Sequence, residues 1–149
     1  MTSEDVVRLL KEAYSDEIET VQNYLANAIL LETIRGEEVA ESLKEDVQEE
    51  LGHAEELGYR LRYHDERPPA SMDLEPSQAS LQPPEDTADV AAVIDGVIEA
   101  ETDAIETYEA LIDAAQAAGD HVTEDLAVQL LADEQAHKAE FLSFKREYE

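Results

Sequence analysis

One set of metal-binding residue types occurs twice along the 149-residue sequence, with the same spacing each time. In the first half, Glu17 is followed by Tyr24 and then by a Glu-x-x-His motif that contains Glu50 and His53. An offset of 84 residues carries this set onto the second half, where the matching residues are Glu101, Tyr108, Glu134 and His137. Four carboxylates with two imidazoles suit iron or manganese, because calcium prefers oxygen ligands alone and structural zinc prefers four nitrogen or sulfur ligands.

The glutamates of this set interrupt helical stripes of apolar residues. Glu17, for example, lies between Tyr14 and Val21 on a stripe with three- and four-residue steps. The acids that interrupt the other stripes in the same way are Glu50, Glu101 and Glu134. Because an ionised carboxylate is costly to bury without compensation, we expect cations to neutralise these four acids, and two divalent ions would balance their charge.

Four helices must position these side chains. The apolar periodicity predicts helices over residues 3–35, 38–64, 87–118 and 122–147. Thr2 and Ser3 are candidate caps of the first helix, and Gly36 and Gly119 are candidate stops of the first and third. Strand-type alternation is absent from the sequence, so we predict an all-α fold in a single domain that spans residues 1–149.

A linker over residues 65–86 separates two helical hairpins. All five prolines lie between residues 68 and 84, and the flanking segments contain none. The linker is long enough to cross the full length of a bundle, so the hairpins can pack with the second and third helices parallel. In that arrangement the four glutamates and two histidines meet near the middle of the bundle.

These motifs resemble those of the ferritin-like di-iron carboxylate superfamily, in which two helices each supply a glutamate and two others each supply Glu-x-x-His. The resemblance implies that six residues ligate two metal ions, namely Glu17, Glu50, His53, Glu101, Glu134 and His137. It also implies that Glu50 and Glu134 bridge the ions. Tyr24 and Tyr108 resemble tyrosines that some members place beside the metals, although core tyrosines with satisfied hydroxyls are the alternative.

The activity that this resemblance implies is oxidation of Fe(II) by oxygen or peroxide, for iron storage or detoxification. Manganese could replace iron at the same ligands. One alternative is an enzyme that scavenges peroxide, similar to rubrerythrins or manganese catalases. Another is a bundle without catalytic activity, in which the metal only stabilises the fold.

Among members of the superfamily, the layout resembles bacterioferritins and Dps-like proteins that have a bacterioferritin-type site. Bacterioferritins bind haem through a methionine directly after the glutamate of the second helix, and this sequence has Leu51 there, so we expect no haem. A standard rubrerythrin is disfavoured, because the chain has no cysteine and Ile98 and Ala104 lie one turn either side of Glu101. We expect a homo-oligomer, either a dimer or a small cage.

The composition excludes several other partners. The chain has 38 acidic and 10 basic residues, a formal net charge of −28, which disfavours nucleic acid and anionic membranes as partners. Such an acidic surface is typical of a halophilic protein, and the alternative is a surface that gathers metal cations. The absence of cysteine excludes thiol chemistry. No stretch approaches the roughly 20 apolar residues that a membrane span needs, and no signal sequence is evident. We therefore expect a cytoplasmic protein.

Overall fold

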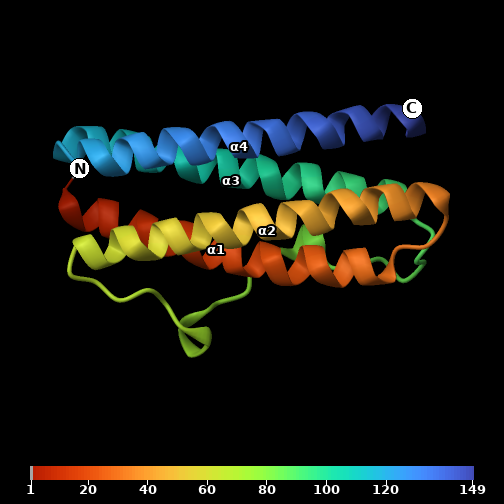
Figure 1. The fold of residues 1–149 in the computed structure, drawn as a ribbon, viewed down its shortest axis with the longest axis horizontal. Coiled ribbons are helices and arrows are strands. Elements are labelled where there is room, and N and C mark those ends of the chain that lie inside the picture. Colours follow the sequence, from red (N-terminus) through yellow and green to blue (C-terminus); the bar gives the residue numbers. More distant parts are fainter. Residues whose placement is uncertain (1) are drawn as a thin grey trace.

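The computed structural model describes residues 2–149, which form four long helices (Figure 1). Their bounds are α1 Ser3–Leu30, α2 Ile34–Tyr63, α3 Val90–Ala118 and α4 His121–Lys145. Three short 3-10 helices also form, η1 Ser71–Asp73, η2 Ala79–Leu81 and η3 Arg146–Tyr148. Residues 2–149 contain no β-strand, so the predicted all-α four-helix bundle is confirmed.

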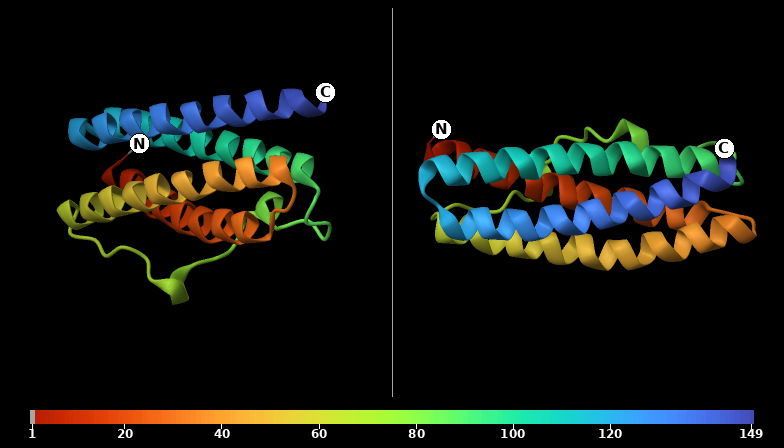
Figure 2. Two further views of the ribbon diagram at one scale, coloured as in Figure 1. Left: turned by 45° about the vertical axis from the view of Figure 1, so that its right-hand side comes forward. Right: turned by 90° about the horizontal axis from the view of Figure 1, so that it is seen from above.

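The helices form two antiparallel hairpins, α1 with α2 and α3 with α4 (Figures 1 and 2). The linker returns along the bundle after α2, so α3 starts at the end where α2 also starts, and these two helices run parallel. The hairpins meet mainly through α1 and α3. This is the arrangement with one long crossover that the sequence predicts.

The turn between α1 and α2 differs from the prediction. Helix α1 ends at Leu30, and α2 begins at Ile34, so Gly36 lies in the first turn of α2 and does not stop α1. Thr33 is the physical reason: it takes a positive φ of 77°, and its side-chain oxygen accepts a hydrogen bond from the Gly36 N–H at 3.1 Å. By contrast, Gly119 ends α3 in the left-handed conformation, with a φ of 72°, as predicted.

The other helix ends lie within three residues of their predicted positions. Helix α2 ends at Tyr63, and α3 begins at Val90, where Asp89 caps it by accepting a hydrogen bond from the Ala92 N–H. Helix α4 covers His121–Lys145 and continues as η3. The linker between α2 and α3 is therefore slightly longer than predicted.

The apolar core is divided into two clusters. One contains Leu43, Val97 and Phe141, and the other contains Leu10 and Leu111, among others. Buried charged side chains of all four helices occupy the level between these clusters. Within the described residues, no helix is long and apolar enough to cross a membrane.

The second half of the linker is fixed in the groove between α1 and α3. The Asn27 side-chain amide donates a hydrogen bond to the Leu81 carbonyl at 2.7 Å, and the Ser80 hydroxyl donates to the Gly96 carbonyl at 3.2 Å. Gly96 permits this contact, because a Cβ at that position would lie 2.1 Å from the Ser80 carbonyl oxygen. The linker therefore covers the α1–α3 side of the bundle directly.

Candidate metal centre

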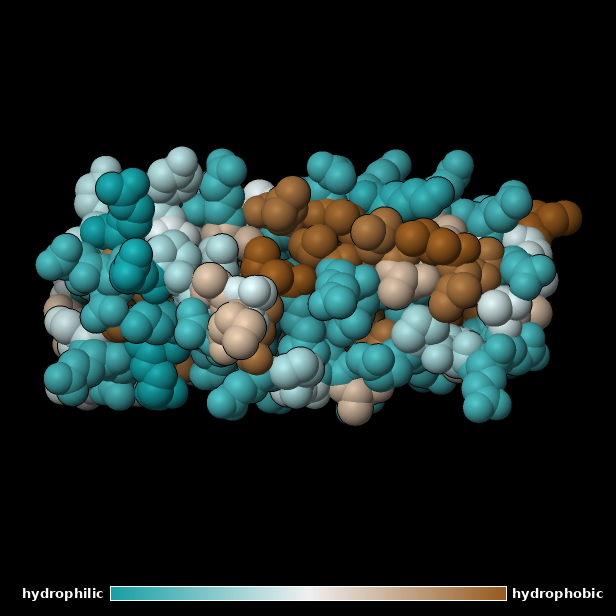
Figure 3. Space-filling view, turned by 90° about the horizontal axis from the view of Figure 1, so that it is seen from below, coloured by the Kyte–Doolittle hydropathy of each residue, from teal (hydrophilic) through white to brown (hydrophobic). Residues whose placement is uncertain are grey.

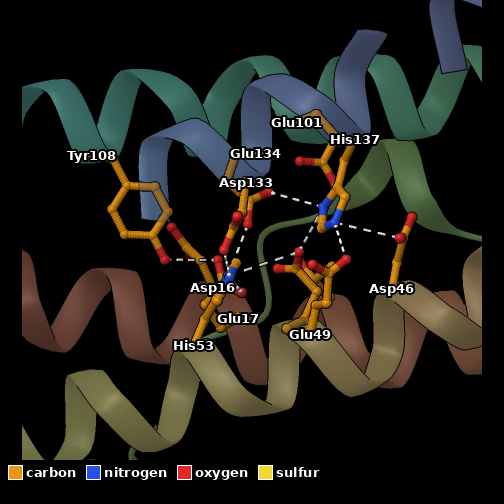
Figure 4. Close-up of polar contacts among 12 residues, drawn as sticks. Asp16, Glu17, Asp46, Glu49, His53, Glu101, Tyr108, Asp133, Glu134 and His137 are labelled. Atoms are coloured by element: carbon orange, nitrogen blue, oxygen red, sulfur yellow. Dashed lines mark hydrogen bonds and ion pairs between the residues drawn. The ribbon is translucent and has the colours of Figure 1, made fainter. Parts of the chain in front are cut away.

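The structure brings six acidic and histidine side chains together between the two core clusters (Figure 4). Helix α1 supplies Glu17, α3 supplies Glu101, and the Glu-x-x-His motifs lie on α2 and α4. The glutamates are at most 2% exposed, and His53 and His137 are each 4% exposed. The helical periodicity places these residues on core-facing stripes, and the matched depth of the two hairpins brings the stripes to one level.

The six side chains divide into two groups of four that share two members. Ligand atoms of the first group lie within 4.8 Å of one another and belong to Glu17, Glu50, His53 and Glu134. The second group meets the same limit and consists of Glu50, Glu101, Glu134 and His137. Two ions could therefore bind side by side, with Glu50 and Glu134 shared between them.

Several atoms in this cluster are buried without a hydrogen-bond partner among the described residues. They include Glu17 Oε2, Glu50 Oε1, Glu101 Oε2, both carboxylate oxygens of Glu134, and Nδ1 of His53 and His137. Some of these atoms form close ion pairs with one another, because His53 Nδ1 lies 3.0 Å from Glu134 Oε1 and His137 Nδ1 lies 3.1 Å from Glu50 Oε1. Buried polar atoms are normally paired, because each unpaired one loses its hydration without compensation. The donor set, with mixed oxygen and nitrogen ligands that face one another, therefore fits a pair of divalent ions.

Without metal, protons must neutralise this cluster. Burial raises the pKa of Glu50 and of Glu101 well above the ordinary value, and neighbouring carboxylates raise both further. Burial also raises the pKa of Glu134, but the contacts of this residue with Glu101 and both histidines outweigh that effect and hold its pKa well below the ordinary range. Of these three carboxylates, Glu134 therefore favours the ionised form, and Glu50 and Glu101 favour the protonated form.

The histidines carry protons in the metal-free chain. Burial lowers the pKa of His53, but its contacts with Glu134 and Glu17 outweigh burial and raise the pKa to about 11. For His137 the balance is similar, and contacts with Glu134 and nearby acids raise the pKa to about 9. Metal binding at the Nδ1 atoms must displace these protons.

Two acids outside the predicted set orient the histidine rings. His53 Nε2 donates to Asp133 Oδ2 at 2.9 Å, and His137 Nε2 donates to Glu49 Oε2 at 2.6 Å. With Nε2 engaged in this way, Nδ1 of each ring faces the glutamates, as Figure 4 shows for His137. The sequence contains a signal for both acids, since each directly precedes the glutamate of a Glu-x-x-His motif and they obey the 84-residue offset.

A third acid, Asp46, has no such sequence signal. Its Oδ1 atom lies 3.4 Å from His137 Nε2, and burial raises its pKa to about 7. The residue at the corresponding position of the second half is Leu130, so the internal repeat does not reveal it. Only one histidine therefore has two acids beside its Nε2 atom.

Both tyrosines contact glutamates of the opposite hairpin. Tyr24 donates a hydrogen bond to Glu101, and Tyr108 donates one to Glu17 Oε1 at 2.9 Å. Burial and the nearby carboxylates raise the pKa of each tyrosine well above the ordinary value, so both hydroxyls remain donors. They hold one oxygen of each carboxylate, and the other oxygen of Glu17 lies 3.4 Å from His53 Nδ1.

Solved structures that resemble this chain share its fold. The bacterioferritin of Rhodobacter capsulatus, described with a metal-free dinuclear site and haem iron, superposes with a TM-score of 0.81 at 21% identity, covering 99% of this chain and 88% of that one. The bacterioferritin of Desulfovibrio desulfuricans, described with a di-iron site in different catalytic states, has a TM-score of 0.81 at 22% identity, covering 95% and 78%.

A third similar structure is the bacterioferritin-related dodecameric thioferritin of Bacteroides fragilis, with a TM-score of 0.84 at 21% identity and coverage of 99% and 88%. No curated protein sequence matches this chain. The family described as the ferritin-like domain matches residues 7–147, which is nearly the whole chain. This chain therefore belongs to the ferritin-like domain family.

Proposed function

We propose that this protein binds two iron ions in the cluster between its hairpins and oxidises Fe(II) with oxygen or peroxide, for iron storage or detoxification. The observation that carries the proposal is the pair of four-residue groups that share Glu50 and Glu134, with buried atoms left unpartnered. The di-iron site described for the Desulfovibrio desulfuricans bacterioferritin supports iron as the metal.

In this proposal Glu17 and His53 would hold one ion, Glu101 and His137 would hold the other, and Glu50 and Glu134 would serve both. Four carboxylates balance the charge of two divalent ions, so the centre becomes neutral without protons on the glutamates. When bound, the two iron ions supply the electrons that reduce oxygen or peroxide. The chain keeps the ligands in place through Glu49 and Asp133 on the histidines and through the tyrosines on Glu17 and Glu101.

Haem is not part of the proposal. The Rhodobacter capsulatus relative contains haem iron, but the residue directly after Glu50 in this chain is Leu51, whose aliphatic side chain offers no ligand atom. We therefore propose that this position does not ligate haem, and a protein fraction without a Soret absorption band after haem addition and gel filtration would agree. A stoichiometric haem complex that survives gel filtration would contradict it.

We also propose that the protein associates with copies of itself, as the dodecameric Bacteroides fragilis relative does. Figure 3 shows hydrophobic side chains gathered in a stripe on the side of the molecule that is lowest in Figure 1. Exposed apolar residues of α1 and α2 include Leu25, Ile29 and Leu51. In a chain with a net charge of −28, copies that meet through an uncharged stripe avoid bringing acids together, so we assign this face to a second copy. Ile29→Glu should lower the molar mass measured by light scattering, and an unchanged mass would contradict the assignment.

The test of function is aerobic addition of excess Fe(II) to metal-free protein in high salt, followed by size exclusion and iron counting. Iron far above two per chain, co-eluting with a large assembly, supports storage. Iron that stops near two per chain in a small oligomer indicates a redox enzyme instead. Absence of bound iron indicates manganese or a structural bundle.

The first prediction concerns Glu50, which both four-residue groups share. Glu50→Ala should lose at least one metal ion per chain and abolish Fe(II) oxidation, because it removes a ligand from both positions. The matched control is Glu45→Ala, an exposed acid on the same helix. Retention of both ions by Glu50→Ala would overturn the ligand assignment, and a change in melting temperature alone would indicate a structural metal.

A further inference from the structure

A cavity of about 140 Å³ lies against the metal centre, between α1, α3 and the linker. We call it the inner cavity. The residues that line it include Asp16, Glu17, Gln78, Ala79, Asp103 and Ala104. Glu17 is 2% exposed, and its Oε2 atom lies 3.4 Å from Nδ1 of His53 in the centre. The inner cavity therefore ends at a side chain that belongs to the centre.

The inner cavity adjoins a larger opening to solvent. This outer cleft has a volume of about 860 Å³ and lies between α1 and the first half of the linker, which stands away from the helices (Figure 1). Asp16 and Ser77 line both the outer cleft and the inner cavity. Because they share these two residues, we treat the two spaces as one candidate path from solvent toward Glu17.

Carboxylates line this path at each stage. Glu12 and Glu75 line the outer cleft, Asp16 lines both spaces, and Glu99 and Asp103 line the inner cavity. Lys11 and Arg67 also line the outer cleft, whereas the lining of the inner cavity includes no lysine or arginine. The carboxylates of the inner cavity therefore raise the local concentration of cations and disfavour anions. The ligand that fits this path is therefore a small divalent cation.

Hydrogen bonds hold the linker wall of the inner cavity in place. The Gln78 side-chain amide donates to Thr20 Oγ1 at 2.7 Å and to the Asp16 carbonyl at 3.2 Å, and its carbonyl oxygen accepts from Asn23 at 3.1 Å. The cavity is therefore part of the folded structure and does not depend on movement of the linker.

The opposite side of the centre is less suited to the entry of a metal ion. Between α2 and α4, the side chains of His53 and His137 are each 5% exposed, and their Nε2 atoms donate to Asp133 and Glu49. An ion that arrives from that side must break these bonds and displace an imidazole ring. On the α1–α3 side, it meets an open space instead.

We propose that the inner cavity is the route by which divalent cations reach the metal centre, with Asp16 and Asp103 as transient carboxylate ligands. The proposal rests on the proposed function insofar as the centre binds metal. It assigns a role to two acids that belong to neither four-residue group. It also assigns a function to the crossover linker, which forms one wall of the route.

The test is stopped-flow binding of Co(II) to the metal-free full chain, with the visible absorption of bound cobalt as the signal. Asp16→Asn/Asp103→Asn should slow loading by about tenfold, the lower end of the usual effect of charge on association rates, and leave the final stoichiometry at two per chain. Glu106→Gln/Glu109→Gln is the matched control, because it removes the same charge from exposed positions of α3 outside the cavity.

A second variant tests whether blocking the cavity slows loading when its charge is unchanged. Ala79→Phe places a large uncharged side chain at the cavity wall, far from the ligands in sequence, and it should also slow loading without changing the stoichiometry. Loading as fast as in the unmodified protein for both variants would overturn the proposed route. Failure of the unmodified protein to bind two cobalt ions would instead overturn the metal centre itself, so the two failures are distinguishable.

Discussion

Four of the six side chains in the centre are supported by a residue of the opposite hairpin. Tyr108 supports Glu17, and Asp133 supports His53, so α3 and α4 hold side chains of α1 and α2. The reverse contacts are Tyr24 with Glu101 and Glu49 with His137. Each hairpin therefore depends on the other for the position of two of its side chains in the centre.

The acids that orient the histidines should matter for metal affinity. Glu49→Ala or Asp133→Ala should weaken Co(II) binding by about 10- to 100-fold, the usual effect of removing a residue that orients a ligating histidine. Equilibrium titration with a competing chelator would measure this change. Glu45→Ala, which removes an exposed acid of α2, is the control, and equal affinities for all variants would show that the rings need no such support.

Metal affinity should rise with pH. Burial lowers the pKa values of His53 and His137, but neighbouring acids outweigh it and raise them from 6.5 to about 11 and about 9, so both rings hold a proton at neutral pH. Each proton displaced by a metal makes the apparent association constant rise about tenfold per pH unit below these pKa values. Calorimetric titration with Co(II) between about pH 6 and 8 would measure this slope and the proton release. An affinity independent of pH would contradict the protonated histidines.

At the residue level, the repeat made much of the site predictable. The same offset that relates Glu17 to Glu101 also relates Glu49 to Asp133, so a full use of the repeat would have found the orienting acids as well. Asp46 and Asp16 could not be found in this way, because their contacts depend on how the helices and the linker pack in three dimensions. In a chain with 38 acidic residues, an acid outside the repeat carries no distinguishing signal.

At the element scale, the linker is as important as the helices. Apolar periodicity predicts the four helices because each buries one stripe, and the proline cluster predicts the linker between them. The turn at Thr33 was not predictable by the same signals, because a threonine rarely adopts a positive φ and a glycine three residues later is the more usual stop. The packing of the linker against α3 was likewise not predictable, because it depends on one glycine of that helix, Gly96.

Substitution by alanine should change the free energy of unfolding in opposite directions at Gly96 and Gly52. Gly96→Ala should lower the free energy of unfolding by about 1–3 kcal/mol, because its Cβ would lie 2.1 Å from the Ser80 carbonyl oxygen and the linker must shift. A Cβ at position 52 would have no neighbour within 4 Å. Gly52→Ala should therefore raise the free energy of unfolding by about 0.5–1 kcal/mol, because alanine loses less backbone entropy than glycine when a helix forms. Urea unfolding of the metal-free variants would measure both changes. Equal stability of the two variants would show that the linker is not held against α3.

At the scale of the whole molecule, charge dominates behaviour in solution. The net charge is −28, and only a few of the acids are buried, at one level of the bundle. Most of the electrostatic repulsion therefore arises between exposed side chains. Salt screens exposed charges far more than buried ones, and the Debye length falls from about 10 Å at 0.1 M to about 3 Å at 1 M.

The metal-free protein should therefore become more stable as salt increases. We expect its urea midpoint to rise from about 0.1 M to about 2 M potassium chloride, since screening weakens repulsion between exposed acids. Glu106→Gln/Glu109→Gln, with two fewer exposed charges, should show a smaller rise. A midpoint that falls with salt would mean that attractive ion pairs, and not repulsion, dominate the surface.

The mutual support of the hairpins bears on how such a centre can originate. A single hairpin carries one glutamate, one Glu-x-x-His motif, one tyrosine and one acid that orients a histidine, which is half of every contact described above. Two identical hairpins related by a twofold axis would complete each other, because every support crosses between them. A homodimer of one hairpin would therefore carry the same six types of ligand, and duplication and fusion of its gene would join the two halves in one chain. Asp46 and Leu130 then mark a place where the two halves have diverged.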